Sequence, residues 1–165
     1  YIKGTSKLCM LKKESDCNKK VGSNGNNRHL KQIEKPRVFI SHRNSDRAQA
    51  EMLRLQKRNG KIEFVDYSIK EPYDKKWIQS ARYRIKTSDA AVCFVGERTA
   101  KSKGMFIESC LCNLYRTPKI IVCKNKNCTI PKYLMTGQYD ISNWNVSQIS
   151  DSINSFERKK RYRKQ

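Results

Sequence analysis

Five side chains that could bind or polarise a ligand lie at or after the ends of apolar runs in this sequence. Ser41, His42 and Arg43 close the first run, Asp66 closes the second, and Glu108 lies about one turn into a helical segment after the third. If they lie close together in the folded chain, these hydroxyl, guanidinium and carboxylate groups can hold a phosphorylated ligand that carries a ribose.

These side chains meet only if the segments that carry them form a parallel sheet. Short β-rich apolar runs alternate with helical spacing in the order β-α-β-α-β-α-β, which is typical of a doubly wound α/β domain. We therefore expect a flavodoxin-like, mainly parallel sheet with helices on both faces, and ligand binding at the carboxyl ends of its strands. The strands are predicted at residues 37–42, 61–67, 90–96 and 119–123.

Three helices are predicted between these strands. In the first, Ala48, Met52 and Leu55 recur at helical spacing with Leu53 adjoining, and Asn59-Gly60 is a typical end signal. The second covers about 74–86 and the third about 104–115, while Trp77 and Trp144 are expected in the core. The stretch 124–155 has weaker signals. There Ile149, Ile153 and Phe156 indicate a closing helix that runs toward the basic end of the chain.

Basic residues are concentrated at both ends of the chain, whose formal net charge is +21. We expect a basic, flexible segment at 1–35, one domain at 36–155 and a basic tail at 156–165. The tail run 158–164 favours non-specific nucleic-acid binding, although no base-reading motif accompanies it. The alternative is that the lysine excess serves solubility. Because the chain begins with Tyr1 rather than Met, we expect its natural start to lie upstream.

Several common functional classes lack their motifs here. No GxGxxG follows the first strand, which argues against a dinucleotide-binding Rossmann domain, and no GxxxxGK[ST] occurs, which excludes a P-loop NTPase. The third strand ends in Val95-Gly96, where a receiver domain would carry aspartate. His29 and His42 are not at metal-ligand spacing and no CxxC occurs, so no metal site is predicted. The seven cysteines are expected to be reduced thiols in a cytoplasmic protein, and no apolar run is long enough to span a membrane.

The core of the sequence resembles a known family over about residues 36–125. The run Arg37-Val38-Phe39-Ile40-Ser41-His42 looks like the opening strand of TIR and TIR-like domains. Three further segments resemble the middle of the TIR-like proteins of the bacterial Thoeris antiphage system, and a fourth matches the strand that follows: 87–89, 91–96, 99–103 and 119–122. Glu108 falls at the position of that family's catalytic glutamate.

The resemblance implies an enzyme that cleaves the bond between nicotinamide and ribose in NAD, by hydrolysis or by cyclisation to a nucleotide signal in antiviral defence. Glu108 would be the catalytic carboxylate, while Ser41, His42, Arg43 and Asp66 would line the nucleotide site. NAD would be the substrate, and no cofactor is expected. The partners implied are a second copy of the chain or an effector that senses the product.

Simpler interpretations exist for the same residues. Glu108 could be a partly buried carboxylate paired with Arg98 or Lys103, and Asp66 could cap its strand. The family commonly has aromatic side chains where this chain has Gly104 and Ile107. These two replacements favour the alternative that the chain is a non-catalytic TIR-type module that signals by self-association.

Overall fold

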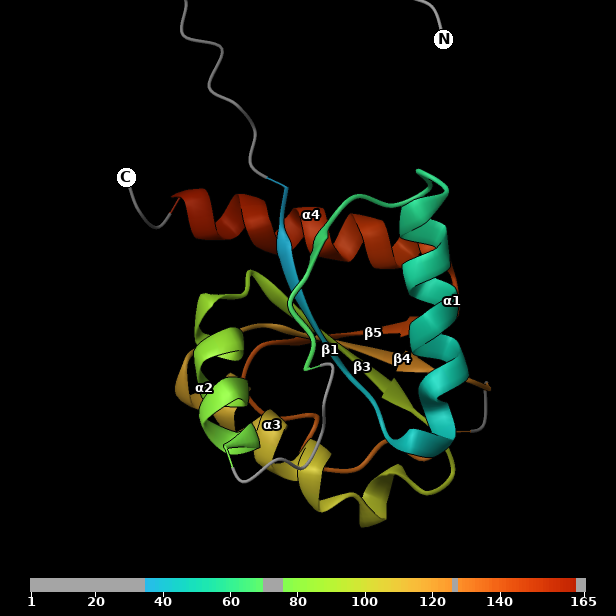
Figure 1. The fold of residues 1–165 in the computed structure, drawn as a ribbon, viewed down its shortest axis with the longest axis vertical. Coiled ribbons are helices and arrows are strands. Elements are labelled where there is room, and N and C mark those ends of the chain that lie inside the picture. Colours follow the sequence, from blue (N-terminus) through green and yellow to red (C-terminus); the bar gives the residue numbers. More distant parts are fainter. Residues whose placement is uncertain (1–34, 70–75, 126–127, 163–165) are drawn as a thin grey trace, which may run out of the picture. The chain divides into compact units, whose positions relative to one another are not determined.

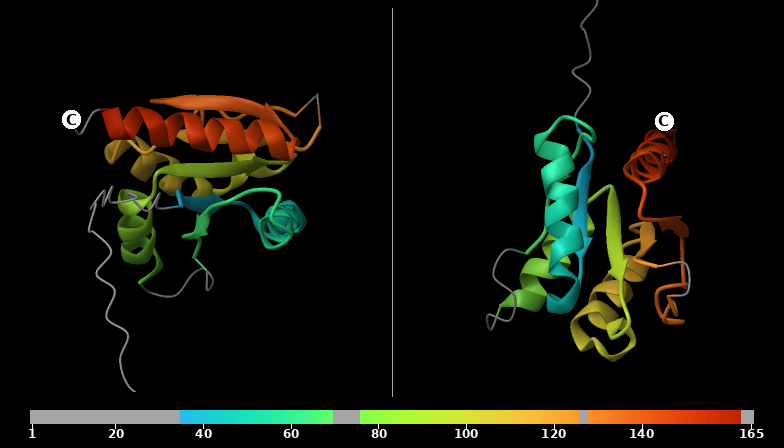
Figure 2. Two further views of the ribbon diagram at one scale, coloured as in Figure 1. Left: turned by 90° about the horizontal axis from the view of Figure 1, so that it is seen from above. Right: turned by 90° about the vertical axis from the view of Figure 1, so that its right-hand side faces the viewer.

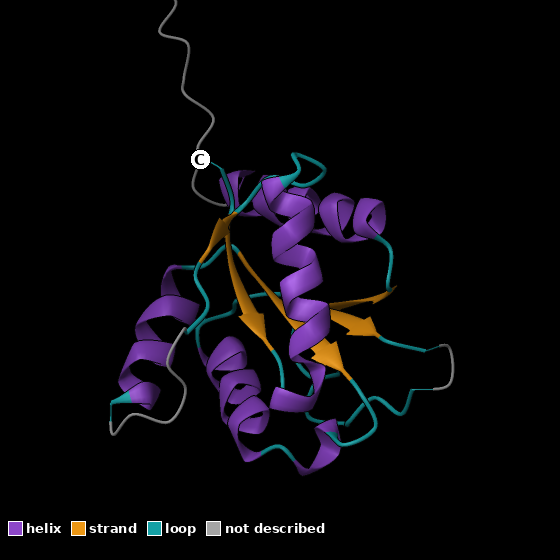
Figure 3. Cartoon of the chain, turned by 45° about the vertical axis from the view of Figure 1, so that its right-hand side comes forward, coloured by secondary structure: helices purple, strands orange, loops and turns teal. Residues whose placement is uncertain are grey.

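Five parallel strands form the centre of the computed structural model of this chain, which describes residues 35–69, 76–125 and 128–162. The sheet order is β2-β1-β3-β4-β5, and every neighbouring pair runs parallel (Figure 3). The strands in chain order are β1 (Arg37–Ser41), β2 (Val65–Asp66), β3 (Ala90–Val95), β4 (Lys119–Cys123) and β5 (Tyr139–Asn143). The predicted α/β class with a parallel sheet is confirmed.

Helices cover both faces of this sheet, as its buried strands require. They are α1 (Arg47–Arg58), α2 (Trp77–Thr87), α3 (Lys103–Leu114) and α4 (Val146–Tyr162), with 3₁₀ turns η1 (Asn44–Asp46) and η2 (Thr99–Lys101). Figure 1 shows α2 and α3 side by side, and Figure 2 shows α4 lying along the sheet next to β3.

The two faces are separated by the alternation of side chains along each strand. In β1, Val38 and Ile40 pack with residues of α1 and α4, whereas Phe39 between them packs with residues of α2 and α3. In β3, Cys93 and Val95 contribute to a third cluster that holds Met105 of α3. The doubly wound arrangement therefore follows from the two-residue period of a pleated strand.

Helix α1 presents a different face to the core than its apolar spacing indicates. Ala50 and Leu53 are fully buried, while Met52 and Leu55 are 48% and 45% exposed. At 100° per residue, these exposed side chains lie more than a quarter turn from the buried pair. Ala50 and Leu53 belong to the buried cluster that includes Val38 and Ile40 of β1, so they form the face of α1 that packs on the sheet.

Other differences from the sequence prediction occur where elements are short or polar. The predicted strand 61–67 is a strand only at Val65–Asp66, although Ile62 and Phe64 are buried in the core. Strand β5 was missed because it lies at the edge of the sheet and is mostly exposed, so its sequence carries no apolar run. Helix α4 continues to Tyr162, well into the segment predicted as a basic tail.

Three of the free cysteines among the described residues are buried. Cys93 and Cys123 lie within buried strands, and on α3 Cys112 is buried while Cys110 is exposed.

None of the helices that the structure describes has the length and apolar character needed to cross a membrane.

The last helix belongs to the core, and this can be tested by truncating a side chain. Ile153 of α4 is 1% exposed, so Ile153→Ala should lower the free energy of unfolding by about 2–4 kcal/mol through lost burial and a residual cavity. Urea denaturation followed by circular dichroism measures the change. The matched control is Ile141→Ala in β5, where the side chain is 50% exposed and the loss should be well under half as large. Equal losses would show that α4 does not contribute to the core.

Candidate active site

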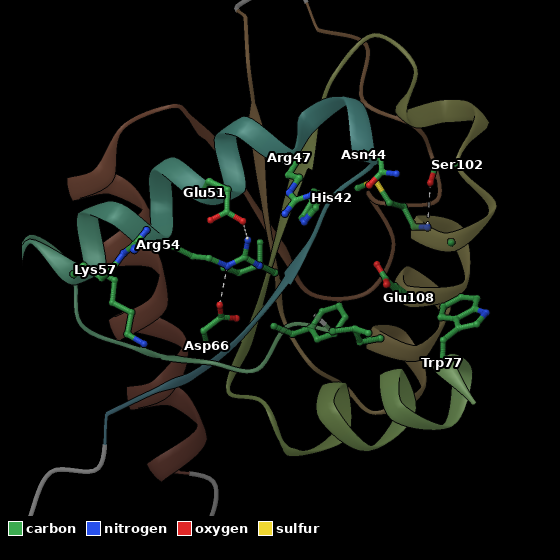
Figure 4. Close-up of a pocket in the computed structure, with 16 residues that line it drawn as sticks. His42, Asn44, Arg47, Glu51, Arg54, Lys57, Asp66, Trp77, Ser102 and Glu108 are labelled. Atoms are coloured by element: carbon green, nitrogen blue, oxygen red, sulfur yellow. Dashed lines mark hydrogen bonds and ion pairs between the residues drawn. The ribbon is translucent and has the colours of Figure 1, made fainter. Parts of the chain in front are cut away.

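A cavity of about 490 Å³ lies at the carboxyl ends of β1 and β2, with α1 and α3 contributing much of its wall (Figure 4). This is where an open parallel sheet places its ligands. The lining side chains are Phe39, Ile40, His42, Asn44, Arg47, Glu51, Arg54, Lys57, Arg58, Asp66, Ile69, Trp77, Ser102, Gly104, Met105 and Glu108.

Glu108 enters this cavity from the second turn of α3. Ser102, which lines the cavity, caps the start of this helix. The Ser102 hydroxyl accepts a hydrogen bond from the backbone N–H of Met105 at 3.4 Å. The Oγ of Ser41, the last residue of β1, donates a hydrogen bond to Oε2 of Glu108 over 2.5 Å. Ser41 and Glu108 are 67 residues apart in sequence, so this hydrogen bond joins strand β1 to helix α3.

The environment of Glu108 favours its protonated form. Burial raises the pKa of Glu108 from 4.5 to about 7, and the hydrogen bond from Ser41 offsets part of this rise. None of the ion pairs among the described residues includes Glu108. The interpretation of Glu108 as the partner of Arg98 or Lys103 is thus not supported, and a carboxyl group that changes charge near neutral pH faces the cavity.

Asp66 differs from Glu108 in that its carboxylate accepts several hydrogen bonds, one of them from a cation, and its pKa is lowered. It accepts hydrogen bonds from Nε of Arg54 at 2.8 Å, from the backbone N–H of Ser68 at 2.9 Å and from the Ser68 hydroxyl. Burial alone would raise the pKa of Asp66, but the hydrogen bonds from Ser68 and Arg54 outweigh it and lower the pKa. Asp66 therefore stays ionised and orients Arg54, whose Nη1 also binds Glu51 at 2.7 Å.

Of the two remaining predicted site residues, His42 and Arg43, only one lines the cavity. His42 lines the cavity, and its Nδ1 lies 3.1 Å from the carbonyl oxygen of Arg43. Arg43 is not among the lining residues, because its Nη1 donates to the carbonyl oxygen of Arg98 at 2.7 Å. The structure thus brings His42, Asp66 and Glu108 to the cavity wall. Ser41 is buried behind Glu108 as its hydrogen-bond partner, and Arg43 lies outside the cavity.

The sequence interpretation missed the contribution of α1. Arg47, Glu51, Arg54 and Arg58 follow one another at intervals of four, three and four residues, so they share one face of the helix, and Lys57 lies beside them. This spacing of charged residues is visible in the sequence, and it marks a different face of the helix from the one that the apolar residues of the same segment indicate. Trp77 was assigned to the core and is in fact half-buried, packing against the cluster around Phe39 and also lining the cavity.

Comparison with known proteins bears on the fold of the chain that carries this site. No protein family model and no curated protein matches the chain. Among solved structures, the chain is similar to the CMP N-glycosidase BcmB of Clostridium botulinum, with 15% sequence identity and a TM-score of 0.51. The similarity covers 72% of this chain and 98% of that protein. The two proteins therefore share an α/β fold.

The raised pKa of Glu108 makes stability depend on pH in a defined direction. Between pH 4.5 and about 7 the folded protein keeps a proton that the unfolded chain has released, so the free energy of unfolding falls as pH rises through this window. Glu108→Gln removes the ionisation and should stabilise the protein at pH 8 by up to about 3 kcal/mol. At pH 4 the effect should be small.

Denaturant titrations at both pH values measure this difference. The control is Glu97→Gln, which removes an exposed carboxylate outside the cavity and should change stability little at either pH. If the difference in stability between Glu108→Gln and wild type is the same at pH 8 and at pH 4, the pKa of Glu108 in the folded protein is not raised.

Proposed function

We propose that this chain is an N-glycosidase that cleaves the bond between a base and ribose in a nucleotide, with Glu108 as its catalytic carboxylate. The observation that carries the proposal is the placement of Glu108, which lies in the wall of the cavity without an ion-pair partner among the described residues and is held by the Ser41 hydroxyl. The fold shared with a CMP N-glycosidase supports it.

One ionised carboxylate suffices for the chemistry. When the C1′–N bond breaks, its electron pair leaves with the base and positive charge develops on C1′ and the ring oxygen. The half-buried Glu108 carboxylate stabilises that charge from the wall of the cavity. Water then adds its oxygen to C1′ and loses a proton, which completes hydrolysis. An internal nucleophile of the same ligand in place of water would give a cyclic product.

We propose NAD as the substrate because of what its leaving group needs. The nicotinamide of NAD is cationic and becomes neutral as it takes the electron pair, so no general acid is required. Of the described carboxylates that line the cavity, Glu51 and Asp66 are bound to Arg54, and only Glu108 is not ion-paired. Trp77 lies at the same end of the cavity as Glu108, where its ring suits a planar base (Figure 4).

The biological role follows from the resemblance in sequence to Thoeris TIR-like proteins. On this proposal, the released ADP-ribose or its cyclic form serves as a signal in antiviral defence. The departure at Gly104 alters the wall of the cavity, the departure at Ile107 alters the core packing of α3, and neither alters the carboxylate itself. Gly104 lines the cavity, while Ile107 packs against the cluster around Phe39 beneath α3.

Incubation of the purified full chain with NAD tests the proposal. Nicotinamide release should fall by about 100-fold or more in Glu108→Gln, because the variant keeps the shape of the side chain and loses its charge. Chromatography of the products distinguishes ADP-ribose from a cyclic nucleotide. Glu97→Gln, the control outside the cavity, should retain full activity. CMP is assayed in parallel through release of cytosine.

Two outcomes would contradict parts of the proposal. Cleavage of CMP but not NAD would refute NAD as the substrate while leaving the glycosidase intact. Cleavage of neither compound, with concentration-dependent self-association that Glu108→Gln leaves unchanged, would refute catalysis and favour the non-catalytic interaction module.

The pH dependence of the reaction follows from the ionisation of Glu108. Only the carboxylate form stabilises the developing cation, so kcat/KM should rise between pH 6 and 8 with a midpoint near the pKa of about 7. Ser41→Ala removes a hydrogen bond that lowers this pKa and should move the midpoint to higher pH. A rate that is unaffected by pH across this range, or a midpoint that does not move in Ser41→Ala, would contradict the assigned role.

A further inference from the structure

The charged face of α1 extends the cavity away from Glu108. Arg47, Lys57 and Arg58 line it together with Arg54. In Figure 4, Glu108 and Trp77 lie at one end, Arg54 and Lys57 lie toward the other, and Arg47 lies between. At a rise of about 1.5 Å per residue, the stripe from residue 47 to residue 58 is about 16 Å long. This length is greater than the ribose and base that would react at Glu108 can occupy.

Charge is unevenly balanced along this stripe. The two carboxylates that face it, Glu51 and Asp66, both bind Arg54, at 2.7 Å and 2.8 Å. None of the ion pairs among the described residues includes Arg47, Lys57 or Arg58. Lys57 is instead placed by the ring of Phe64, whose centroid lies 5.3 Å from Nζ. The cavity wall therefore carries an excess of positive charge beyond the reacting end.

We propose that the face of α1 formed by Arg47, Lys57 and Arg58 is a diphosphate-binding subsite that selects nucleotides whose two nucleosides are joined through phosphates. The subsite rests on the proposed function for the orientation of the ligand, with the scissile ribose at Glu108. A mononucleotide bound there places its one phosphate near that ribose, whereas a bridging diphosphate and second nucleoside extend along α1. Guanidinium groups bind phosphate oxygens through paired N–H donors.

The ion-paired Arg54 has a different part in this subsite. Its guanidinium joins Glu51 of α1 to Asp66 at the end of β2, which fixes the helix against the sheet edge. Ser68 continues this link, because its hydroxyl donates to Asp66 and its oxygen accepts from the backbone N–H of Ile40. Arg54 is thus a positioning residue, and the phosphates are bound by the cations on either side of it.

The binding test uses the full chain with inorganic pyrophosphate and with ADP-ribose, by isothermal titration calorimetry at fixed ionic strength. Arg47 and Arg58 are exposed, so Arg47→Gln/Arg58→Gln should fold normally. It should bind both probes at least about 10-fold more weakly than wild type, since each lost charged hydrogen bond costs that much or more. The control Arg82→Gln removes an exposed charge from α2, outside the cavity, and should bind as wild type does.

The same variants separate the subsite from the proposed catalysis. In nicotinamide-release assays, the double variant should raise KM for NAD about 10-fold and leave KM for nicotinamide riboside, which has no phosphate, unchanged. Equal binding of pyrophosphate by wild type and double variant, absence of binding by wild type, or an equal loss in Arg82→Gln overturns the subsite. Binding that depends on Arg47 and Arg58 in a chain that cleaves neither NAD nor CMP supports the subsite and refutes the glycosidase.

Discussion

The hydrogen bond from Ser41 to Glu108 joins the end of the first strand to the helix that follows the third. Strand β1 lies next to β3 in the sheet, so the two chain segments leave the sheet at adjacent points. Helix α3 then returns across the same edge and brings its second turn over Ser41. The cavity, the burial of the carboxyl group and its raised pKa all depend on this one meeting of segments.

Placing a carboxyl group there has an energetic cost that the rest of the fold must offset. Ionised Glu108 is disfavoured by burial, and no ion pair among the described residues compensates it. Asp66 shows the contrast, because the same kind of side chain in the same cavity is kept ionised by Arg54 and Ser68. The pKa values of the two carboxyl groups are thus shifted in opposite directions, upward for Glu108 and downward for Asp66. On the proposed function, Glu108 responds to charge in a ligand while Asp66 holds structure.

Helix α1 serves the core and the cavity with different faces. Ala50 and Leu53 anchor it to the sheet, and their small or compact side chains keep the helix close to β1. The neighbouring face carries Arg47, Arg54 and Arg58 into the cavity wall, and the remaining face exposes Met52 and Leu55 to solvent. The rotation of this one helix about its axis therefore decides how much positive charge the cavity has.

The sequence by itself determined the architecture and the rim on which the site lies. Apolar runs such as 90–95 must be buried on both faces, which requires helices on both sides of a parallel sheet, and loops that follow such strands share one edge. Glu108, Ser41, His42 and Asp66 could be placed near each other for that reason. Tertiary structure alone decided that Glu108 is half-buried and bonded to Ser41, that Arg43 turns to Arg98, and that the charged face of α1 is the one in the cavity. Periodicity gives the spacing of side chains along an element but not its rotation, and a pKa depends on neighbours that are distant in sequence.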